Sequence, residues 1–82
     1  MGSFYPPLDR EQVEFILKKA GFFLKRQEAS HAQWEGYVDD KRRIVTVKNL
    51  KSKTEKYSRQ LLGKMIVQSG LSKKSFYSYL NK

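Results

Sequence analysis

The stretch FFLKRQEASHAQWEGYVDDKRRIVTVK, residues 22–48, decides the fold of this 82-residue chain. Apolar and polar side chains alternate with the two-residue period of β-strands through three segments: residues 22–28, 31–38 and 42–48. Two short stretches rich in turn-forming residues separate the segments, Ala29-Ser30 and Asp39-Asp40-Lys41. Strands joined by such short turns predict an antiparallel meander.

The alternation within residues 31–38 assigns the two faces of this sheet. The small and apolar side chains fall on one face, which we take as buried: Ala32, Trp34 and Gly36. His31 falls on the opposite, open face. A loop formed by Glu28-Ala29-Ser30 would place three pairs opposite each other in the first hairpin: Gln27 with His31, Lys25 with Gln33, and Leu24 with Trp34. The apolar pair Leu24–Trp34 would then lie on the buried face.

A helix is expected before the strands. Asp9 and Gln12 have the spacing of a capping box, in which two side chains satisfy the free N–H groups at a helix start. Apolar residues at helical spacing follow, which predicts a helix over residues 10–20 that Gly21 ends. Residues 1–8 are expected to form a short N-terminal arm before a single domain, residues 9–82.

Two helices are expected after the strands. Ser58 is the predicted cap of a helix over residues 59–69, which Gly70 ends. Ser72 is the predicted cap of a last short helix. The order α-β-β-β-α is typical of a two-layer α+β domain, here with the helices on one face of a three-stranded antiparallel sheet. The other face of the sheet would stay open.

The charge of the chain is strongly basic, since 17 lysines and arginines outnumber 8 aspartates and glutamates by 9. This balance favours polyanionic partners, nucleic acid first and an acidic protein second. There is no cysteine and no metal-ligand spacing, so neither a metal nor a cofactor is expected. No apolar run approaches the ~20 residues of a membrane span, and the N-terminus lacks a signal-peptide pattern. We therefore expect a cytoplasmic protein with no membrane partner.

His31 is the only histidine of the chain. Histidine is the side chain whose ordinary pKa, about 6.5, allows proton transfer near neutral pH. A lone histidine near a turn is also commonly a solvated polar residue, so both interpretations stay open at this point. The expected register puts Gln33 and Lys25 nearer to His31 than Glu35, and Lys25 is a candidate phosphate contact. Glu35 lies four residues along the strand, about 13 Å away, which is too far for a hydrogen bond to His31.

Five cations precede and enter the second helix, and we call them the connector cations: Lys48, Lys51, Lys53, Lys56 and Arg59. The N-terminus of a helix already favours phosphate through its free N–H groups. Lysines at such a place let a fold hold a nucleic-acid backbone without reading its sequence. The competing interpretation is that this charge serves solubility.

Three stretches of the chain together resemble the HicA family of toxins. They are Leu17-Lys18-Lys19-Ala20-Gly21-Phe22, then Arg26-Gln27-Glu28-Ala29-Ser30-His31, and finally Val67-Gln68-Ser69-Gly70-Leu71-Ser72. The second is similar to the family's Gly-Ser-His motif, with Ala29 in place of the glycine. The connector departs from the family's proline-containing one. None of the three stretches is specific by itself, but their spacing along the chain is more specific. The resemblance covers residues 9–80.

The resemblance implies a double-stranded-RNA-binding-like fold and the function of an mRNA interferase. It implies the toxin of a type II toxin–antitoxin system, a metal-independent endoribonuclease with His31 as its catalytic residue and Ser30 as a candidate RNA contact. It also implies a partner, a HicB-like antitoxin that masks the active site. The alternatives are a non-catalytic RNA-binding domain of the same fold and a small DNA-binding regulator.

Overall fold

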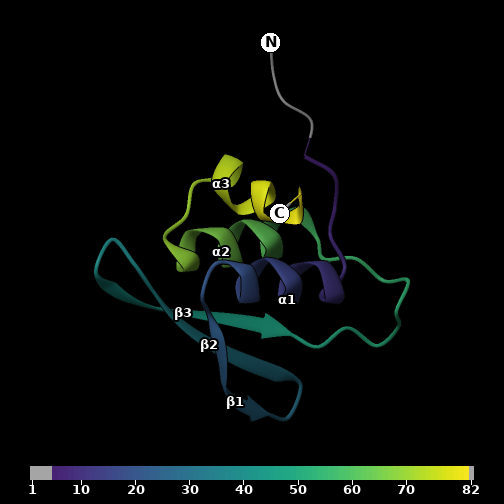
Figure 1. Ribbon diagram of the computed structural model, residues 1–82. Coiled ribbons are helices and arrows are strands. Elements are labelled where there is room, and N and C mark those ends of the chain that lie inside the picture. Colours follow the sequence, from purple (N-terminus) through teal and green to yellow (C-terminus); the bar gives the residue numbers. More distant parts are fainter. Residues whose placement is uncertain (1–4, 82) are drawn as a thin grey trace.

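The computed structural model describes residues 5–81, so the predicted arm, residues 1–8, is described from Tyr5 onward. The elements follow in the predicted order (Figure 1): α1 (Arg10–Lys19), β1 (Phe23–Glu28), β2 (His31–Val38), β3 (Lys41–Lys48), α2 (Arg59–Ser69), α3 (Lys73–Ser78) and a final 3-10 turn (Tyr79–Asn81). The three strands form one antiparallel sheet in the order β1-β2-β3. The predicted α+β class and α-β-β-β-α arrangement are confirmed.

Polar side chains fix the starts of all three α-helices, as predicted. The Asp9 carboxylate accepts a hydrogen bond from the Gln12 N–H at 2.8 Å, and the Gln12 side chain accepts one from the Asp9 N–H at 2.9 Å. Ser58 and Ser72 accept the corresponding bonds at the starts of α2 and α3. These bonds satisfy N–H groups that a helix leaves free at its start.

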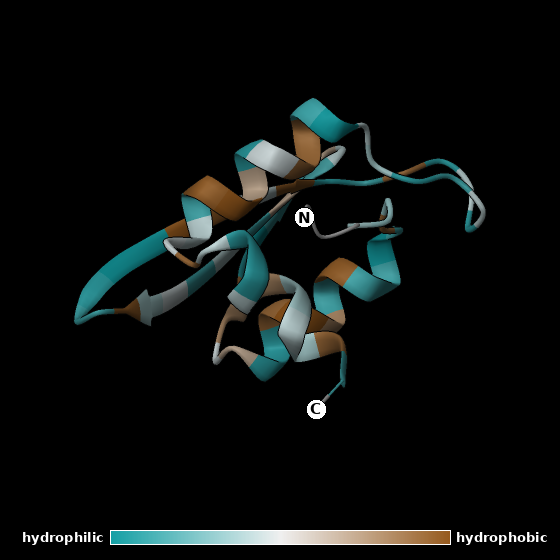
Figure 2. Ribbon diagram, turned by 90° about the horizontal axis from the view of Figure 1, so that it is seen from above, coloured by the Kyte–Doolittle hydropathy of each residue, from teal (hydrophilic) through white to brown (hydrophobic). Residues whose placement is uncertain are grey.

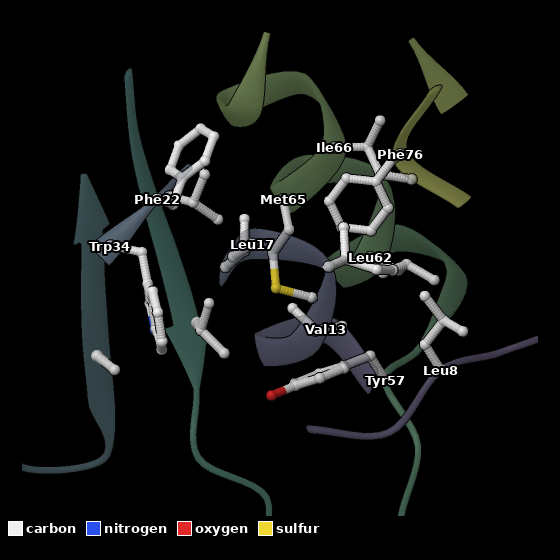
Figure 3. Packing of buried hydrophobic residues seen from close by; sticks show 14 residues of the cluster. Leu8, Val13, Leu17, Phe22, Trp34, Tyr57, Leu62, Met65, Ile66 and Phe76 are labelled. Atoms are coloured by element: carbon white, nitrogen blue, oxygen red, sulfur yellow. The ribbon is translucent and has the colours of Figure 1, made fainter. Parts of the chain in front are cut away.

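The helices cover one face of the sheet and leave the other open (Figure 1). Along β2, Ala32 and Trp34 are buried against the helical layer, whereas His31 is exposed on the opposite face. Figure 3 shows the resulting core, in which side chains of the sheet meet those of α1 and α2. The predicted assignment of the two faces of β2 is therefore confirmed.

β1 differs from the expectation that Leu24 is buried. Leu24 does lie opposite Trp34, but its side chain is 49% exposed while Trp34 is 3% exposed. All six residues of β1 are exposed, because this edge strand lies farthest from the helices (Figure 1). β1 is thus exposed on both of its faces, whereas β2 has one buried face.

The described part of the arm packs against the domain. Leu8 is fully buried, and its carbonyl accepts a hydrogen bond from the Tyr57 N–H at 2.9 Å. The Tyr77 hydroxyl donates to the Pro6 carbonyl at 2.7 Å. Figure 2 shows this segment beside the helical layer. The segment before α1 is therefore part of the packing that holds α2 and α3 in place.

Candidate functional site

The first hairpin has a different register from the expected one around His31. Its loop contains only Ala29 and Ser30, so Glu28, and not Gln27, lies opposite His31. Lys25 falls in a β-bulge between Leu24 and Arg26, and the bulge restores the predicted Leu24–Trp34 pair. The predicted pairs Gln27–His31 and Lys25–Gln33 are wrong, because a two-residue loop shifts every partner by one position.

The short loop depends on the backbone of Ala29, whose φ is +49°. Two-residue hairpin loops require such left-handed backbone, because it matches the twist of the flanking strands. An alanine adopts it at a cost, since its Cβ crowds the following carbonyl oxygen. The Gln27 amide donates to the carbonyls of Ala29 and His31, at 3.3 and 3.2 Å, and braces the turn.

Replacing Ala29 by glycine is expected to stabilise the domain. Glycine adopts positive φ without the crowding of a Cβ, so the gain should be about 1 kcal/mol. This corresponds to a rise of about 4–8 °C in melting temperature for a domain of this size. Thermal unfolding of Ala29→Gly beside wild type measures it. A lower melting temperature would show that the left-handed turn is not the conformation that the protein uses.

His31 stands at the start of β2 between two charged residues of the neighbouring strands. Glu28 of β1 and Lys48 of β3 are its direct partners in register, so all three side chains share the open face. Directly opposed residues have Cβ atoms about 4.5–5.5 Å apart. His31 is therefore flanked by a carboxylate on one side and an ammonium group on the other, an arrangement that the predicted register did not contain.

Ser30 fixes the orientation of the His31 ring. Its hydroxyl lies 3.2 Å from His31 Nδ1, and its carbonyl accepts a hydrogen bond from the Asn49 N–H at 2.7 Å. Within residues 5–81, no hydrogen bond uses the other ring nitrogen, Nε2. With the proton on Nδ1, this nitrogen donates to Ser30 Oγ, and Nε2 is free to accept a proton.

Lys25 lies at a different part of the sheet from His31. Its Nζ is 3.2 Å from Glu35 Oε1, while Arg42 Nε is 3.1 Å from Glu35 Oε2. The Glu35 carboxylate thus bridges the edge strands from the middle of the sheet. The hydrogen bond from Arg42, followed by the one from Lys25, lowers the pKa of Glu35 below its usual value. The ion pair with Glu35 gives Lys25 a structural partner, for which a phosphate must compete.

Because the pKa of Glu35 is lower in the folded protein than in the unfolded chain, folding favours its charged form. Its contribution to stability is present above pH 4.5 and is lost as the pH falls below that value. We expect Glu35→Gln to be less stable than wild type at pH 7, and the difference to shrink as unfolding is measured at decreasing pH down to 3. Glu28→Gln, which removes a 58% exposed carboxylate with one ion-pair partner, Arg26, is the matched control. An unchanged difference at pH 3 would contradict this role of Glu35.

The connector cations line the chain between the end of β3 and the start of α2. All five side chains are exposed, and none forms an ion pair within the described part of the chain. Lys48 lies beside His31, and the Tyr57 hydroxyl donates to the Lys48 carbonyl at 2.7 Å. Burial raises the pKa of Tyr57 to about 12, so this donor keeps its proton at neutral pH. The bond ties the side chain of Tyr57, near the far end of the connector, to the backbone of Lys48, the residue beside His31.

Comparison with protein families agrees with the three stretches of similarity in the sequence. The model described as "HicA toxin of bacterial toxin-antitoxin" matches residues 10–71, which is most of the chain. The chain belongs to the HicA family. Comparisons with curated proteins and with solved structures give no match. Membership of the HicA family supports a toxin role and implies an antitoxin as the partner of this chain.

Two further features of the structure concern metals and membranes. Within residues 5–81, no three side chains of histidine, cysteine, aspartate or glutamate gather where they could hold a metal ion. Over the same residues, every helix is too short or too polar to cross a membrane.

Proposed function

We propose that this HicA-family chain is an endoribonuclease that cuts mRNA, with His31 as its catalytic acid and base. The observation that carries the proposal is the position of His31, exposed at the edge of the open face with Nδ1 beside Ser30 and with Nε2 free. The similarity of Ala29-Ser30-His31 to the Gly-Ser-His motif supports the same assignment. The family match supports the toxin role that such cleavage would produce.

RNA cleavage of this type needs a base, an acid and positive charge. The base takes the proton of a 2′-hydroxyl, whose oxygen then attacks the adjacent phosphorus. The bond from phosphorus to the 5′-oxygen breaks, and the acid gives that oxygen a proton. With one histidine in the chain, His31 either serves both steps in turn or shares them with a second group.

Glu28 is the candidate for the second group, and Lys48 is the candidate for the charge. Both flank His31 directly across the strands, so one scissile phosphate can reach all three side chains. Arg26 Nη1 lies 3.3 Å from Glu28 Oε2 and holds this carboxylate on the β1 side. In this proposal Lys48 offsets the charge that develops on the phosphate during attack.

The remaining proposed contacts hold the RNA strand. Ser30 acts mainly by positioning His31 and can also contact the substrate. The connector cations beyond Lys48 bind further phosphates along the connector, and Lys25 binds one only in competition with Glu35. We include a HicB-like antitoxin in the proposal, as an acidic protein that lies over His31 and excludes RNA. The net charge of +9 would speed their encounter, and added salt would slow it.

Induced expression in bacteria tests the proposal. Wild type should arrest growth and deplete mRNA, whereas His31→Ala at the same protein level should do neither. Growth arrest by both proteins would remove His31 from the mechanism. Arrest without mRNA loss would favour the alternative, an RNA-binding domain that does not cut.

A further inference from the structure

A groove lies in the helical layer, away from the open face. Its volume is about 580 Å³, and it is formed by segments far apart in the sequence. Leu62 and Ile66 of α2 form its apolar floor, Tyr5 and Tyr77 line its side, and Arg59 and Lys73 bring positive charge to it. In Figure 1, the segment before α1, the helix α2 and the helix α3 lie together at this place. Volumes of this size are common for binding sites.

Gly63 lines this groove and has no side chain that would fill it. It lies within α2, and a Cβ built on it meets no atom within 4 Å. Glycine weakens a helix interior relative to alanine, and nothing in the packing of residues 5–81 requires it there. A glycine that lines a groove without a neighbour leaves room for the close approach of another molecule.

The chemistry of the lining favours a protein side chain over a nucleobase. The hydroxyls of Tyr57 and Tyr77 already donate to the carbonyls of Lys48 and Pro6, so the charged donors that the lining offers are Arg59 and Lys73. The floor is aliphatic, and a buried aliphatic surface suits an apolar side chain. Two copies of a chain with a net charge of +9 repel each other, which disfavours a second copy as the occupant of the groove.

The charge of the groove indicates what surrounds that apolar side chain. Its lining includes Arg59 and Lys73 and no carboxylate. Lys73 Nζ lies 5.2 Å from the centre of the Tyr5 ring, and no ion pair within residues 5–81 uses either cation. An acidic segment with one apolar residue complements this arrangement in both shape and charge.

We infer that the groove anchors the antitoxin through an apolar side chain flanked by carboxylates, as a contact separate from the one that covers His31. The inference rests on the antitoxin that the family implies, and it does not require that the toxin cut RNA. Arg59 belongs both to the groove and to the connector cations, so antitoxin bound in the groove would also take one proposed phosphate contact away from RNA.

The test measures the binding of a purified HicB-like antitoxin by calorimetry, with no RNA present. Gly63→Leu fills the groove and should weaken binding at least tenfold. Gly63→Ala, whose Cβ fits, is the matched control and should bind within threefold of wild type. Lys73→Gln changes an exposed side chain, and should weaken binding and reduce its dependence on salt. Both Gly63 variants should melt no lower than wild type, since alanine and leucine favour helix over glycine.

The inference would be overturned if Gly63→Leu and Lys73→Gln bound the antitoxin as strongly as wild type does. It would also be overturned if wild type itself did not bind the antitoxin. Weaker binding of single-stranded RNA by Gly63→Leu, with antitoxin binding intact, would assign the groove to RNA instead. A wild-type dimer in solution that Gly63→Leu disrupts would assign it to a second copy. Calorimetry measures antitoxin binding and does not depend on RNA cleavage. A failure of the proposed nuclease activity would therefore be seen in a cleavage assay and not in this experiment.

Discussion

Replacing His31 by alanine is expected to lower the rate of RNA cleavage by about 10²–10⁴, the range for loss of a general acid or base. The side chain is exposed, and its one hydrogen bond is to its neighbour Ser30. Its removal should therefore change the free energy of unfolding by less than about 0.5 kcal/mol. Cleavage rates with excess enzyme, together with thermal unfolding of both proteins, measure the two effects separately.

Gln33→Ala is a suitable control for this experiment. Gln33 lies two residues along β2 on the same face, and it carries no group that titrates near neutral pH. It should retain most of the cleavage rate. Equal rates for wild type and His31→Ala would remove the catalytic assignment, and an unfolded His31→Ala would require the same comparison with His31→Gln.

RNA binding is expected to weaken steeply with salt. Each phosphate contact contributes about 0.7 to the slope of log K against log salt for a single strand. Four engaged connector cations would give a slope of about −3, so affinity should fall about 50-fold between 50 and 200 mM salt. Fluorescence anisotropy with labelled single-stranded RNA and the non-cutting His31→Ala protein measures this slope.

Charge removal at the connector tests which cations are engaged. The double variant Lys53→Gln with Lys56→Gln should reduce the slope by about 1.4 and weaken binding to all sequences alike. Lys64→Gln with Lys74→Gln removes the same charge from exposed positions of α2 and α3, and should leave the slope nearly unchanged. Equal effects of the two double variants would show that net charge, and not the connector, determines binding.

The helix boundaries could be predicted from local chemistry. Asp9, Ser58 and Ser72 each satisfy N–H groups within three residues of themselves, so a single sequence contains all the information needed for a helix start. The faces of β2 were predictable for a similar reason, since alternation is also local. The exposure of Leu24 was not, because it depends on how far the helices extend over the sheet.

The neighbours of His31 could not be predicted, because register depends on backbone conformation. The predicted register placed Glu28 in the loop with Ala29 and Ser30, whereas the structure closes the loop with Ala29 and Ser30 alone, through the positive φ of Ala29. The β-bulge at Lys25 restores the register, so the predicted pair Leu24–Trp34 is correct although the predicted pairs nearer the loop are wrong. Glu28 was overlooked as a partner of His31 for this reason. The motif itself contained one usable signal, a glycine position that implies positive φ.

The groove beside Gly63 lay beyond the reach of local patterns altogether. It is formed by the arm, α2 and α3, and residues as distant as Pro6 and Tyr77 are joined there by a hydrogen bond. The one clue in the sequence was a glycine inside an otherwise regular helical stripe. The sequence shows that this glycine weakens the helix, but it does not show the open space beside the glycine.

The proposed activity of this chain is cleavage of RNA by its own side chains, through His31. The most direct measurement incubates purified wild type and His31→Ala with a labelled single-stranded RNA in the presence of EDTA. The account predicts that wild type shortens the RNA and leaves a cyclic phosphate at the new 3′ end, while His31→Ala leaves the RNA intact. Intact RNA with wild type until a divalent cation is added, or equal cleavage by both proteins, would contradict it.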